Sequence, residues 1–412
     1  MKDDWTECCF EDLLDYEQPT KYIVKSTKYN DSYKMPVLTA GKTFIKGYTN
    51  ETDGIFDNLP TIIFDDFTTA MQYVNFKFKV KSSAMKILVP TSKLVNMPLV
   101  YYAMQVNQVR SDTHKRYWIS VFAKKKFLLP PLVEQKEIVK KIEALFSSLD
   151  SGIADLKKAQ EQLKIYRQAV LKKAFEGEYP QKKIIEIADV KTGATPKRGN
   201  AKYWENGTIP WVTSTVVNDE FVNQSSELIT ETAIKETNCK LIPKGSLLMA
   251  MYGEGKTRGK CSELNIDTAT NQALAAITLL EENKESKKFL KLFLLKNYEE
   301  IRLLSSGGVQ PNLNLTIVKN TVIPFPSLKE QHQIVKGIES RLSVCDKVEK
   351  DIADSLEKAQ ALRQSILKKA FEGKLLSEAE IAACKQHPDY EPASVLLEKI
   401  KAEKRNNGER TK

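Results

Sequence analysis

The sequence of 412 residues has little of the material that metal sites and membrane anchors need. Its three histidines lie far apart, and its six cysteines do not have the paired spacing of zinc ligands. No apolar run approaches the ~20 residues that cross a bilayer, and the acidic start MKDDWTECCFEDLLDYEQ does not resemble a signal peptide. We therefore expect no bound metal, no membrane association and a cytoplasmic protein.

Catalytic motifs are scarce as well. There is no Asp/Asn-Pro-Pro-aromatic tetrapeptide of the kind that orients an adenine amino group in N6 methyltransferases, although DNLP at 57–60 is a partial match. We interpret Asp65 and Asp66 in IIFDDF as structural or DNA-contacting carboxylates rather than nuclease ligands. The sequence therefore predicts a non-catalytic protein, with no catalytic residue assigned.

The charge balance permits a nucleic-acid partner without requiring one. Lysine and arginine number 63 against 53 aspartates and glutamates, which gives a net charge of +10. The excess is spread along the chain, so charge alone does not decide the class of function.

A duplication organises the chain. Residues 134–177 match residues 330–373 without a gap, each position recurring 196 positions later, and both copies end in LKKAFEG. Apolar residues recur at steps of three and four, which is typical of a coiled-coil seam on a long helix. The predicted seam consists of Ile138, Ile142, Leu145, Leu149, Leu156, Leu163, Val170, Ile334, Ile338, Leu342, Ile352, Leu362 and Ile366.

The length of the two predicted helices indicates their relative direction. A helix of ~42 residues is about 63 Å long, so parallel helices would force the segment between them to return that whole distance. We therefore expect an antiparallel pair, with a globular domain at each end.

The globular segments correspond more faintly. MPVLT at 35–39 matches IPWVT at 209–213, and SSAMKIL at 82–88 matches NQALAAI at 271–277. Short β-branched and aromatic runs broken by Gly, Pro and Asn favour mixed α+β domains. We predict an α+β protein of two pseudo-symmetric domains joined by two long antiparallel coiled-coil helices. The expected order is domain 1–130, helix 131–178, domain 179–325, helix 326–375 and a C-terminal segment 376–412.

The C-terminal segment has one short amphipathic stretch. Val395, Leu396 and Ile400 fall on one face of a predicted helix, and a polar tail follows it. We expect this helix either to dock on a partner protein or to pack on the helix pair.

The chain resembles the specificity subunit of Type I DNA restriction-modification systems. The resemblance covers nearly the whole sequence and rests on PPLVEQKEIV and FPSLKEQHQIV, the two LKKAFEG ends, and VKTGATPKRGNAKYW, GTIPWV, TNQA and GGVQPNLN in the second domain. It implies double-stranded DNA with a bipartite site, one half read by each domain. It also implies two methyltransferase subunits and two restriction/translocase subunits, with S-adenosylmethionine, ATP and Mg held by those partners and no cofactor on this chain.

Basic loops are the candidate DNA contacts. Glycines beside cations let a backbone approach a phosphate closely, although solvated loop charges would look the same. The candidates are Lys42, Lys46, Lys77, Lys79, Thr195, Lys197, Arg198, Lys202, Gly253, Lys256, Arg258 and Lys260. The FKFKVK alternation around Lys77 and Lys79 fits an exposed strand face equally well.

Two other functions share part of this pattern. Ala250 followed by Gly255-Lys256-Thr257 fits a loose nucleotide phosphate loop, but such a loop needs a helix directly after it. The following RGKCSELNIDTATNQ has no helical period, and the corresponding IIFDDFTTAMQYV lacks Gly-Lys-Thr. A nucleotide-dependent enzyme and a coiled-coil scaffold without a DNA role remain the alternatives.

Overall fold

A computed structural model describes residues 4–41, 43–108, 116–253, 256–303 and 312–409. The chain divides into two compact units. Unit 1 comprises Met1–Leu156 with Asp354–Lys412, and unit 2 comprises Lys157–Ala353. Both contain mixed strands and helices, and each includes part of both long helices. The predicted α+β class with two long helices is confirmed. None of the helices in the described part of the chain combines the length and apolar character needed to span a bilayer.

The long helices are α3 (Leu132–Ala174) and α10 (Leu328–Phe371). Each follows a proline turn that a buried glutamine closes. Gln135 Nε2 donates to the carbonyl of Pro130 at 2.8 Å, and Gln331 Nε2 donates to that of Pro326 at 2.9 Å. The two glutamines are counterparts in the duplication, so the repeated Glu-Gln signature marks a repeated structural contact.

The same ion pair between α3 and α10 occurs once in each unit. In unit 1, Arg363 Nη2 lies 3.0 Å from Asp150 Oδ2. In unit 2, Arg167 Nη2 lies 2.6 Å from Asp346 Oδ1. Arg363 is the counterpart of Arg167, and Asp346 is the counterpart of Asp150. The helices are therefore antiparallel in both units, as predicted.

The seam prediction is wrong at two positions. Leu145 and Leu362 have 38% and 51% of their surface exposed. Phe146, four residues after Ile142, points inward in place of Leu145. Arg363 points inward in place of its neighbour Leu362. The Arg363 guanidinium covers the Phe146 ring at 4.1 Å from its centroid.

The other seam positions point inward to different degrees. Leu149, Leu156, Leu163, Ile334 and Leu342 are half-buried. The fully buried positions are Ile138, Ile142, Val170, Ile338, Ile352 and Ile366.

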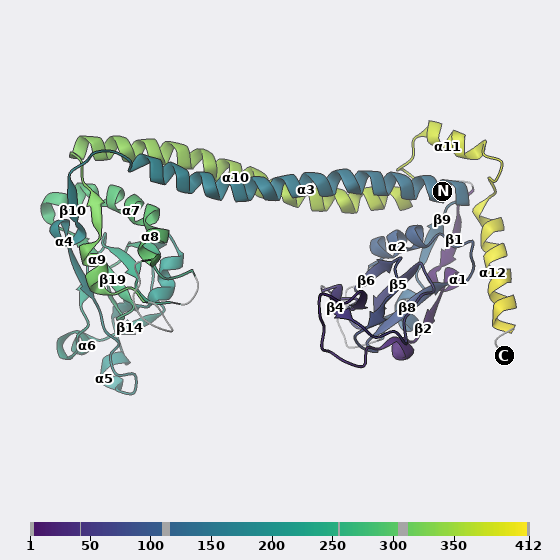
Figure 1. The fold of residues 1–412 in the computed structure, drawn as a ribbon, viewed down its shortest axis with the longest axis horizontal. Coiled ribbons are helices and arrows are strands. Elements are labelled where there is room, and N and C mark those ends of the chain that lie inside the picture. Colours follow the sequence, from purple (N-terminus) through teal and green to yellow (C-terminus); the bar gives the residue numbers. More distant parts are fainter. Residues whose placement is uncertain (1–3, 42, 109–115, 254–255, 304–311, 410–412) are drawn as a thin grey trace. The chain divides into compact units, whose positions relative to one another are not determined.

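The described residues of unit 1 form three small sheets. Figure 1 labels most of their strands. The largest sheet is antiparallel, in the order β2-β8-β5-β6, and the second has the order β4-β3-β7, with β3 parallel to β7. Strand β1 pairs with β9. The bounds are β1 (Thr6–Cys9), β2 (Leu14–Glu17), β3 (Met35–Leu38), β4 (Ile45–Thr49), β5 (Thr61–Asp65), β6 (Met71–Val74), β7 (Lys79–Val80), β8 (Met85–Pro90) and β9 (Lys126–Leu129); the shorter helices are α1 (Phe10–Leu13), α2 (Met97–Val106), α11 (Glu378–Lys385) and α12 (Ala393–Glu409).

Unit 2 repeats this topology with one strand added to each large sheet. The orders are β11-β19-β16-β17-β13 and β14-β12-β18-β15, with β12 parallel to β18, and β10 pairs with β20. The strands are β10 (Gln181–Lys183), β11 (Ala188–Thr192), β12 (Ile209–Val212), β13 (Phe221–Val222), β14 (Glu227–Ile229), β15 (Leu241–Ile242), β16 (Leu247–Ala250), β17 (Cys261–Leu264), β18 (Thr268–Thr270), β19 (Leu274–Leu279) and β20 (Val322–Pro324). The helices are α4 (Ile184–Ile187), α5 (Ala201–Trp204), α6 (Glu231–Glu236), α7 (Lys287–Lys296), α8 (Tyr298–Leu303) and α9 (Leu315–Asn320).

Both sequence matches between the domains fall on equivalent strands. MPVLT forms β3 and IPWVT forms β12, and each pairs with one parallel and one antiparallel neighbour. The second match covers β8 and β19, each of which lies between two antiparallel strands. By these correspondences, β5 and β6 of unit 1 are the equivalents of β16 and β17 of unit 2.

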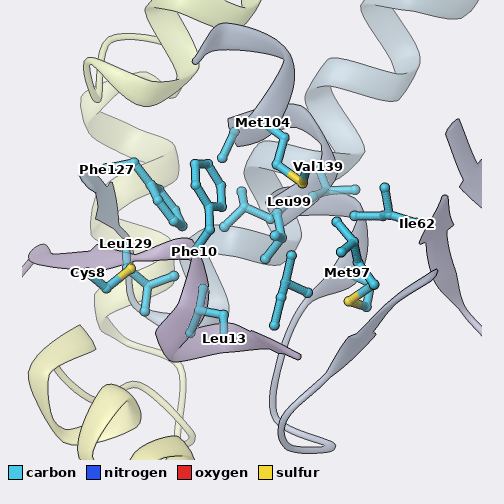
Figure 2. Packing of buried hydrophobic residues seen from close by; sticks show 14 of the residues in the cluster. Cys8, Phe10, Leu13, Ile62, Met97, Leu99, Met104, Phe127, Leu129 and Val139 are labelled. Carbon is cyan, nitrogen blue, oxygen red and sulfur yellow. The ribbon is translucent and has the colours of Figure 1, made fainter. Parts of the chain in front are cut away.

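The core of each unit includes the ends of both long helices. In unit 1, Phe10, Leu99 and Phe127 pack with Val139 of α3 (Figure 2) and with Leu367 of α10. Unit 2 uses the opposite ends of the two helices: Leu171 of α3, with Phe175 directly after it, and Val335 and Ile338 of α10 belong to one hydrophobic core cluster. Burying each such side chain contributes about 1.5–3 kcal/mol, so each domain is fixed to the helix pair by its core.

The C-terminal segment packs on unit 1. Tyr390 donates to Asp4 at 2.8 Å and to Glu134 at 3.3 Å, and Trp5 Nε1 donates to Glu134 at 2.9 Å. Lys141 of α3 binds Glu380 of α11 at 2.6 Å. Lys141 and backbone donation from Ser377 hold the pKa of Glu380 at about 2.

Helix α12 contacts α1 and β1, as Figure 1 shows. Its buried face differs from the predicted one, because Val395 is exposed and Leu397 is buried beside Leu396 and Ile400.

Candidate nucleic-acid interface

The basic segment that contains Lys256 and Thr257 lies between the two strands of a β-hairpin. Strand β16 precedes it, and the next element is β17, which pairs antiparallel with β16 through Met249 and Cys261. A nucleotide phosphate loop instead passes into a helix whose N-terminus meets the phosphates. The geometry therefore favours a basic loop over a nucleotide site.

The described part of this loop rests on α8. The Tyr298 hydroxyl donates to the carbonyl of Lys256 at 2.6 Å, and Arg302 Nη1 donates to that of Arg258 at 2.9 Å. Gly259 takes a φ of +85°, a left-handed conformation that suits glycine. These contacts fix the backbone and leave the Lys256 side chain exposed, with no ion pair among the described residues.

Three other candidates in this loop lie close to Lys256 in sequence. Gly253 has a φ of +139°, and a side chain there would press on Thr257. Arg258 is half-buried. Lys260 Nζ donates to Asn218 Oδ1 at 2.8 Å, which ties this loop to the segment after β12.

The second basic loop follows β11. A Cβ at Gly193 would lie 1.8 Å from the carbonyl oxygen of Thr270, so only glycine allows this close approach. Thr195 Oγ1 donates to Gln272 Oε1 at 2.9 Å. Lys197 is exposed and has no ion pair among the described residues.

Arg198 and Lys202 are held by neighbours in unit 2. The Arg198 guanidinium lies 4.2 Å from the Trp204 ring centroid and 4.9 Å from that of Trp211, and it pairs with Glu227. Lys202 pairs with Glu236 at 2.6 Å. These contacts identify Arg198 as a structural element of the loop.

The two basic loops flank one turn of unit 2. Gln272 accepts from Thr195, and the neighbouring Ala273 carbonyl accepts from the N–H of Met251 at 2.8 Å. Two segments about 60 residues apart in sequence, each of which carries an exposed lysine, therefore contact the turn between β18 and β19.

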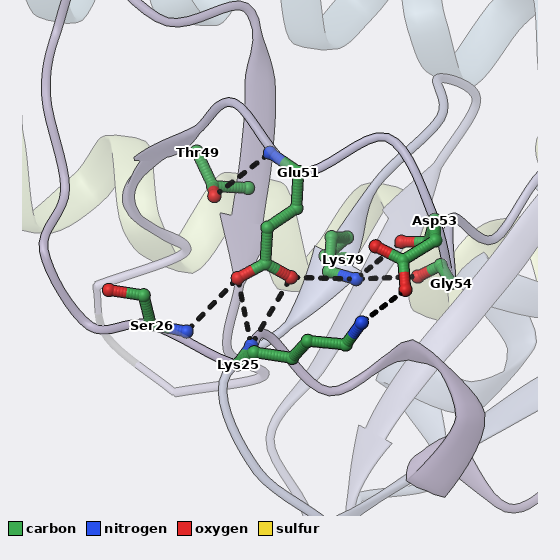
Figure 3. A network of polar contacts seen from close by, with 7 residues as sticks. All are labelled: Lys25, Ser26, Thr49, Glu51, Asp53, Gly54 and Lys79. Carbon is green, nitrogen blue, oxygen red and sulfur yellow. Dashed lines mark hydrogen bonds and ion pairs between the residues drawn. The ribbon is translucent and has the colours of Figure 1, made fainter.

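The prediction for Lys79 is wrong because its side chain is buried. Its surface is 1% exposed, and Nζ lies 3.1 Å from Glu51 Oε2 and donates to the carbonyl of Asp53 at 2.6 Å (Figure 3). Burial alone would raise the pKa of Glu51, but donation from the Ser26 N–H and from Lys79 holds it below its ordinary value. Lys79 therefore braces the loop at 51–54 rather than facing a ligand.

The other candidates in unit 1 differ in accessibility. Lys46 is exposed on β4, without an ion pair among the described residues. Lys77 is exposed and lies 3.6 Å from Asp57. Lys42 falls outside the described residues.

One basic segment of unit 1 was not among the DNA contacts predicted from the sequence. Because β2 and β3 correspond to β11 and β12, the connection containing residues 23–34 corresponds to the loop that carries Lys197. Lys28 and Lys34 are exposed in it. The MPVLT and IPWVT match contained the signal needed to find them.

The paired aspartates of unit 1 hold a turn together. Asp65 Oδ1 accepts from the N–H groups of Phe67 and Thr68 at 2.9 and 2.8 Å, and buried Asp66 accepts from Trp118 N at 2.8 Å. These contacts support the structural interpretation. Within the described ranges, no group of three or more His, Cys, Asp or Glu residues is arranged to hold a metal ion.

Comparison with known proteins gives a consistent match. A sequence model of the Type I restriction modification DNA specificity domain matches residues 2–160 and 176–358. The chain is 35% identical over 370 residues to the Type I restriction enzyme EcoR124I/EcoR124II specificity subunit of Escherichia coli, covering 86% of this chain and 89% of that protein. It is 22% identical to the MjaVIII specificity subunit of Methanocaldococcus jannaschii, covering 89% and 92%.

Solved structures share the fold. A chain from a study of complex assembly and conformational transition in the type I R-M system aligns with a TM-score of 0.68 at 16% identity, covering 90% of this chain and 98% of that one. The HsdS subunit from Thermoanaerobacter tengcongensis aligns with a TM-score of 0.55 at 18% identity, covering 91% and 98%.

Proposed function

Because this chain belongs to the Type I restriction-modification DNA specificity family, whose general role is DNA target recognition, we propose that it reads a bipartite DNA site. Each unit would read one half-site. The observation that carries this proposal is the repetition of one sheet topology with different loops. Equivalent frames with different loops are suited to reading two different base sequences.

The hairpin at the equivalent position in each unit illustrates the difference. In unit 2, residues 251–260 join β16 to β17 and include Lys256, Arg258 and Lys260. In unit 1, the shorter turn between β5 and β6 carries Asp65 and Asp66 and has no cation. The hairpin of unit 2 would therefore contact DNA phosphates through its cations, whereas the hairpin of unit 1 has no cation with which to do so.

We assign the chemistry to other chains. The proposal places this protein in the cytoplasm with two methyltransferase and two restriction/translocase subunits, which would hold S-adenosylmethionine, ATP and Mg. This chain would be non-catalytic and would direct those subunits to the site. The β-hairpin around Lys256 supports this view over a nucleotide-dependent enzyme, and the duplicated recognition-type domains support it over a scaffold.

Methylation mapping tests this function. We expect that co-expressing the chain with its methyltransferase subunit produces methylated adenines in one split, asymmetric motif. The purified chain alone should transfer no methyl group. A continuous motif, or the same methylation without this chain, would contradict the proposal.

Lys256→Ala tests the basic hairpin. We expect the assembled complex to bind specific and non-specific DNA more weakly by a similar factor, because a phosphate contact carries no base information. The slope of log affinity against log salt should fall by about one unit. Lys284→Ala, which removes a cation paired with Glu281 on its own segment, is the matched control. Loss of affinity for one base sequence only would show that Lys256 does not act through a phosphate.

A further inference from the structure

A groove in unit 1 lies between α2 and the two long helices and has a volume of about 480 Å³. Its walls come from three segments that are far apart in the sequence. The residues that matter here are Tyr101, Tyr102, Glu143, Phe146, Asp150 and Arg363.

Aromatic rings line one side of the groove. Tyr102 meets Phe146 edge-on at a centroid distance of 5.8 Å, and Tyr101 lies 5.8 Å from Tyr102. Burial and the neighbouring Glu143 carboxylate raise the pKa of Tyr102 to about 12, so its phenol stays neutral. Neutral rings beside a carboxylate form an environment that attracts cations.

The charges in the groove are unevenly matched. Arg363 pairs with Asp150 at 3.0 Å and covers Phe146, so the charges of Arg363 and Asp150 compensate one another. Glu143 is exposed and forms no ion pair with any described residue. The groove thus keeps one uncompensated carboxylate beside its rings, and that carboxylate would repel a DNA phosphate.

In unit 2, the carboxylate equivalent to Glu143 has a partner within the chain. Glu339 is the counterpart of Glu143, and Lys288 of α7 binds it at 2.9 Å. Donation to Glu339 is the main reason that the pKa of Lys288 is raised. A lysine ammonium group therefore occupies this position in unit 2.

Unit 1 has no such lysine, because α2 differs from α7 at the matching position. The two helices bury corresponding residues 190 positions apart: Leu99, Val100, Ala103 and Met104 in α2, and Phe289, Leu290, Phe293 and Leu294 in α7. This alignment places Pro98 opposite Lys288. Proline cannot supply the cation that the duplicated site accepts.

We propose that the groove receives a lysine or arginine side chain from a methyltransferase subunit, with Glu143 as its counter-ion and Tyr102 beside it. This inference rests on the proposed function for the identity of the partner. The uncompensated carboxylate, the rings and the Lys288–Glu339 contact of unit 2 specify the chemistry of the guest.

Photo-crosslinking tests the occupant. The photoreactive amino acid p-benzoylphenylalanine replaces Tyr102, and the purified complex with the co-expressed methyltransferase is irradiated and analysed by mass spectrometry. We expect a crosslink to a methyltransferase peptide with a Lys or Arg at or beside the modified position. The same replacement at Tyr166, exposed on α3 in unit 2, is the control. Crosslinks only within this chain, or none in an assembled complex, would overturn the proposal.

Charge variants give a second measurement that does not depend on crosslinking. Glu143 is exposed, so Glu143→Gln and Glu143→Lys should fold normally. We expect the dissociation constant for the methyltransferase to rise about threefold for Glu143→Gln and at least about tenfold for Glu143→Lys, because the latter places a like charge against the guest. Glu161→Lys, at an exposed residue of α3 that pairs with Lys164 on its own helix, should change it less than about twofold.

The outcomes separate this inference from the proposed function. Unchanged affinity in Glu143→Lys, with normal methylation of a split motif, would overturn the groove assignment and leave DNA recognition intact. Absence of a split motif in the wild-type complex would instead contradict the proposed function.

Discussion

Lengthening both long helices by one heptad should change the DNA spacing that the complex accepts. The insertions belong after Lys158 in α3 and after Asp354 in α10, which keeps both Arg–Asp pairs on their original sides. Seven residues add about 10 Å at ~1.5 Å per residue, or about three base pairs at ~3.4 Å each. We expect the methylated motif to keep both half-sites and to gain about three base pairs between them.

The helical phase of DNA adds a second effect. Three base pairs turn the duplex by roughly 100°, whereas a heptad nearly restores the phase of a coiled coil. Affinity for the longer site should therefore be weaker, and specific binding is lost if neither DNA nor protein twists to compensate. Inserting a heptad into α3 alone is the control. The resulting protein should not assemble into a complex, because Arg167 or Asp150 is then out of register with its ion-pair partner on α10. Unchanged preference for the original spacing after the double insertion would show that the helices do not set the distance.

Replacing Lys79 should destabilise unit 1 more than any exposed lysine does. Lys79→Met leaves Glu51 and the carbonyls of Asp53 and Gly54 without their buried donor. Removing one member of a buried pair typically costs about 3–5 kcal/mol, and Glu51 keeps its backbone donors, so we expect about 3 kcal/mol. Hydrogen-exchange mass spectrometry in urea measures it, with peptides from unit 2 as the internal reference.

Lys77→Met is the matched control for this substitution. Its side chain is 63% exposed and lies 3.6 Å from Asp57, so the free energy of unfolding should change by less than about 0.5 kcal/mol. Combining Lys79→Met with Glu51→Gln should recover part of the loss, since no unpaired carboxylate remains. Equal effects of Lys77→Met and Lys79→Met would contradict the buried network.

The long helices were predictable because their signals are local and occur twice. The proline turn, the Glu-Gln pair and the steps of three and four all lie within single segments. The seam prediction failed at Leu145 because the adjacent apolar residue Phe146 takes the inward position. It failed at Leu362 because a polar side chain can occupy an inward position when it finds a partner. Arg363 does so by covering Phe146 and pairing with Asp150, and residue polarity alone does not reveal such contacts.

The candidate site was harder to predict because it depends on burial and on loops. Lys79 and Lys77 look alike in FKFKVK, yet one is buried and the other exposed. The partner of Lys79, Glu51, lies 28 positions away in the sequence, and no local pattern connects the two residues. That the segment around Lys256 is not a nucleotide phosphate loop was predictable, because the sequence after it lacks a helical period and its counterpart in the first domain lacks Gly-Lys-Thr.

The duplicated Arg–Asp pairs also select the polarity of the helix pair. Each copy of the repeat carries the aspartate of one pair and, 17 positions further along, the arginine of the other pair, so antiparallel copies bring unlike charges together twice. If the copies instead ran parallel and in register, Asp150 would face Asp346 and Arg167 would face Arg363. Both attractive ion pairs would then be replaced by pairs of like charges that repel one another. Duplication of a single segment has therefore encoded a preference against parallel self-association of that segment.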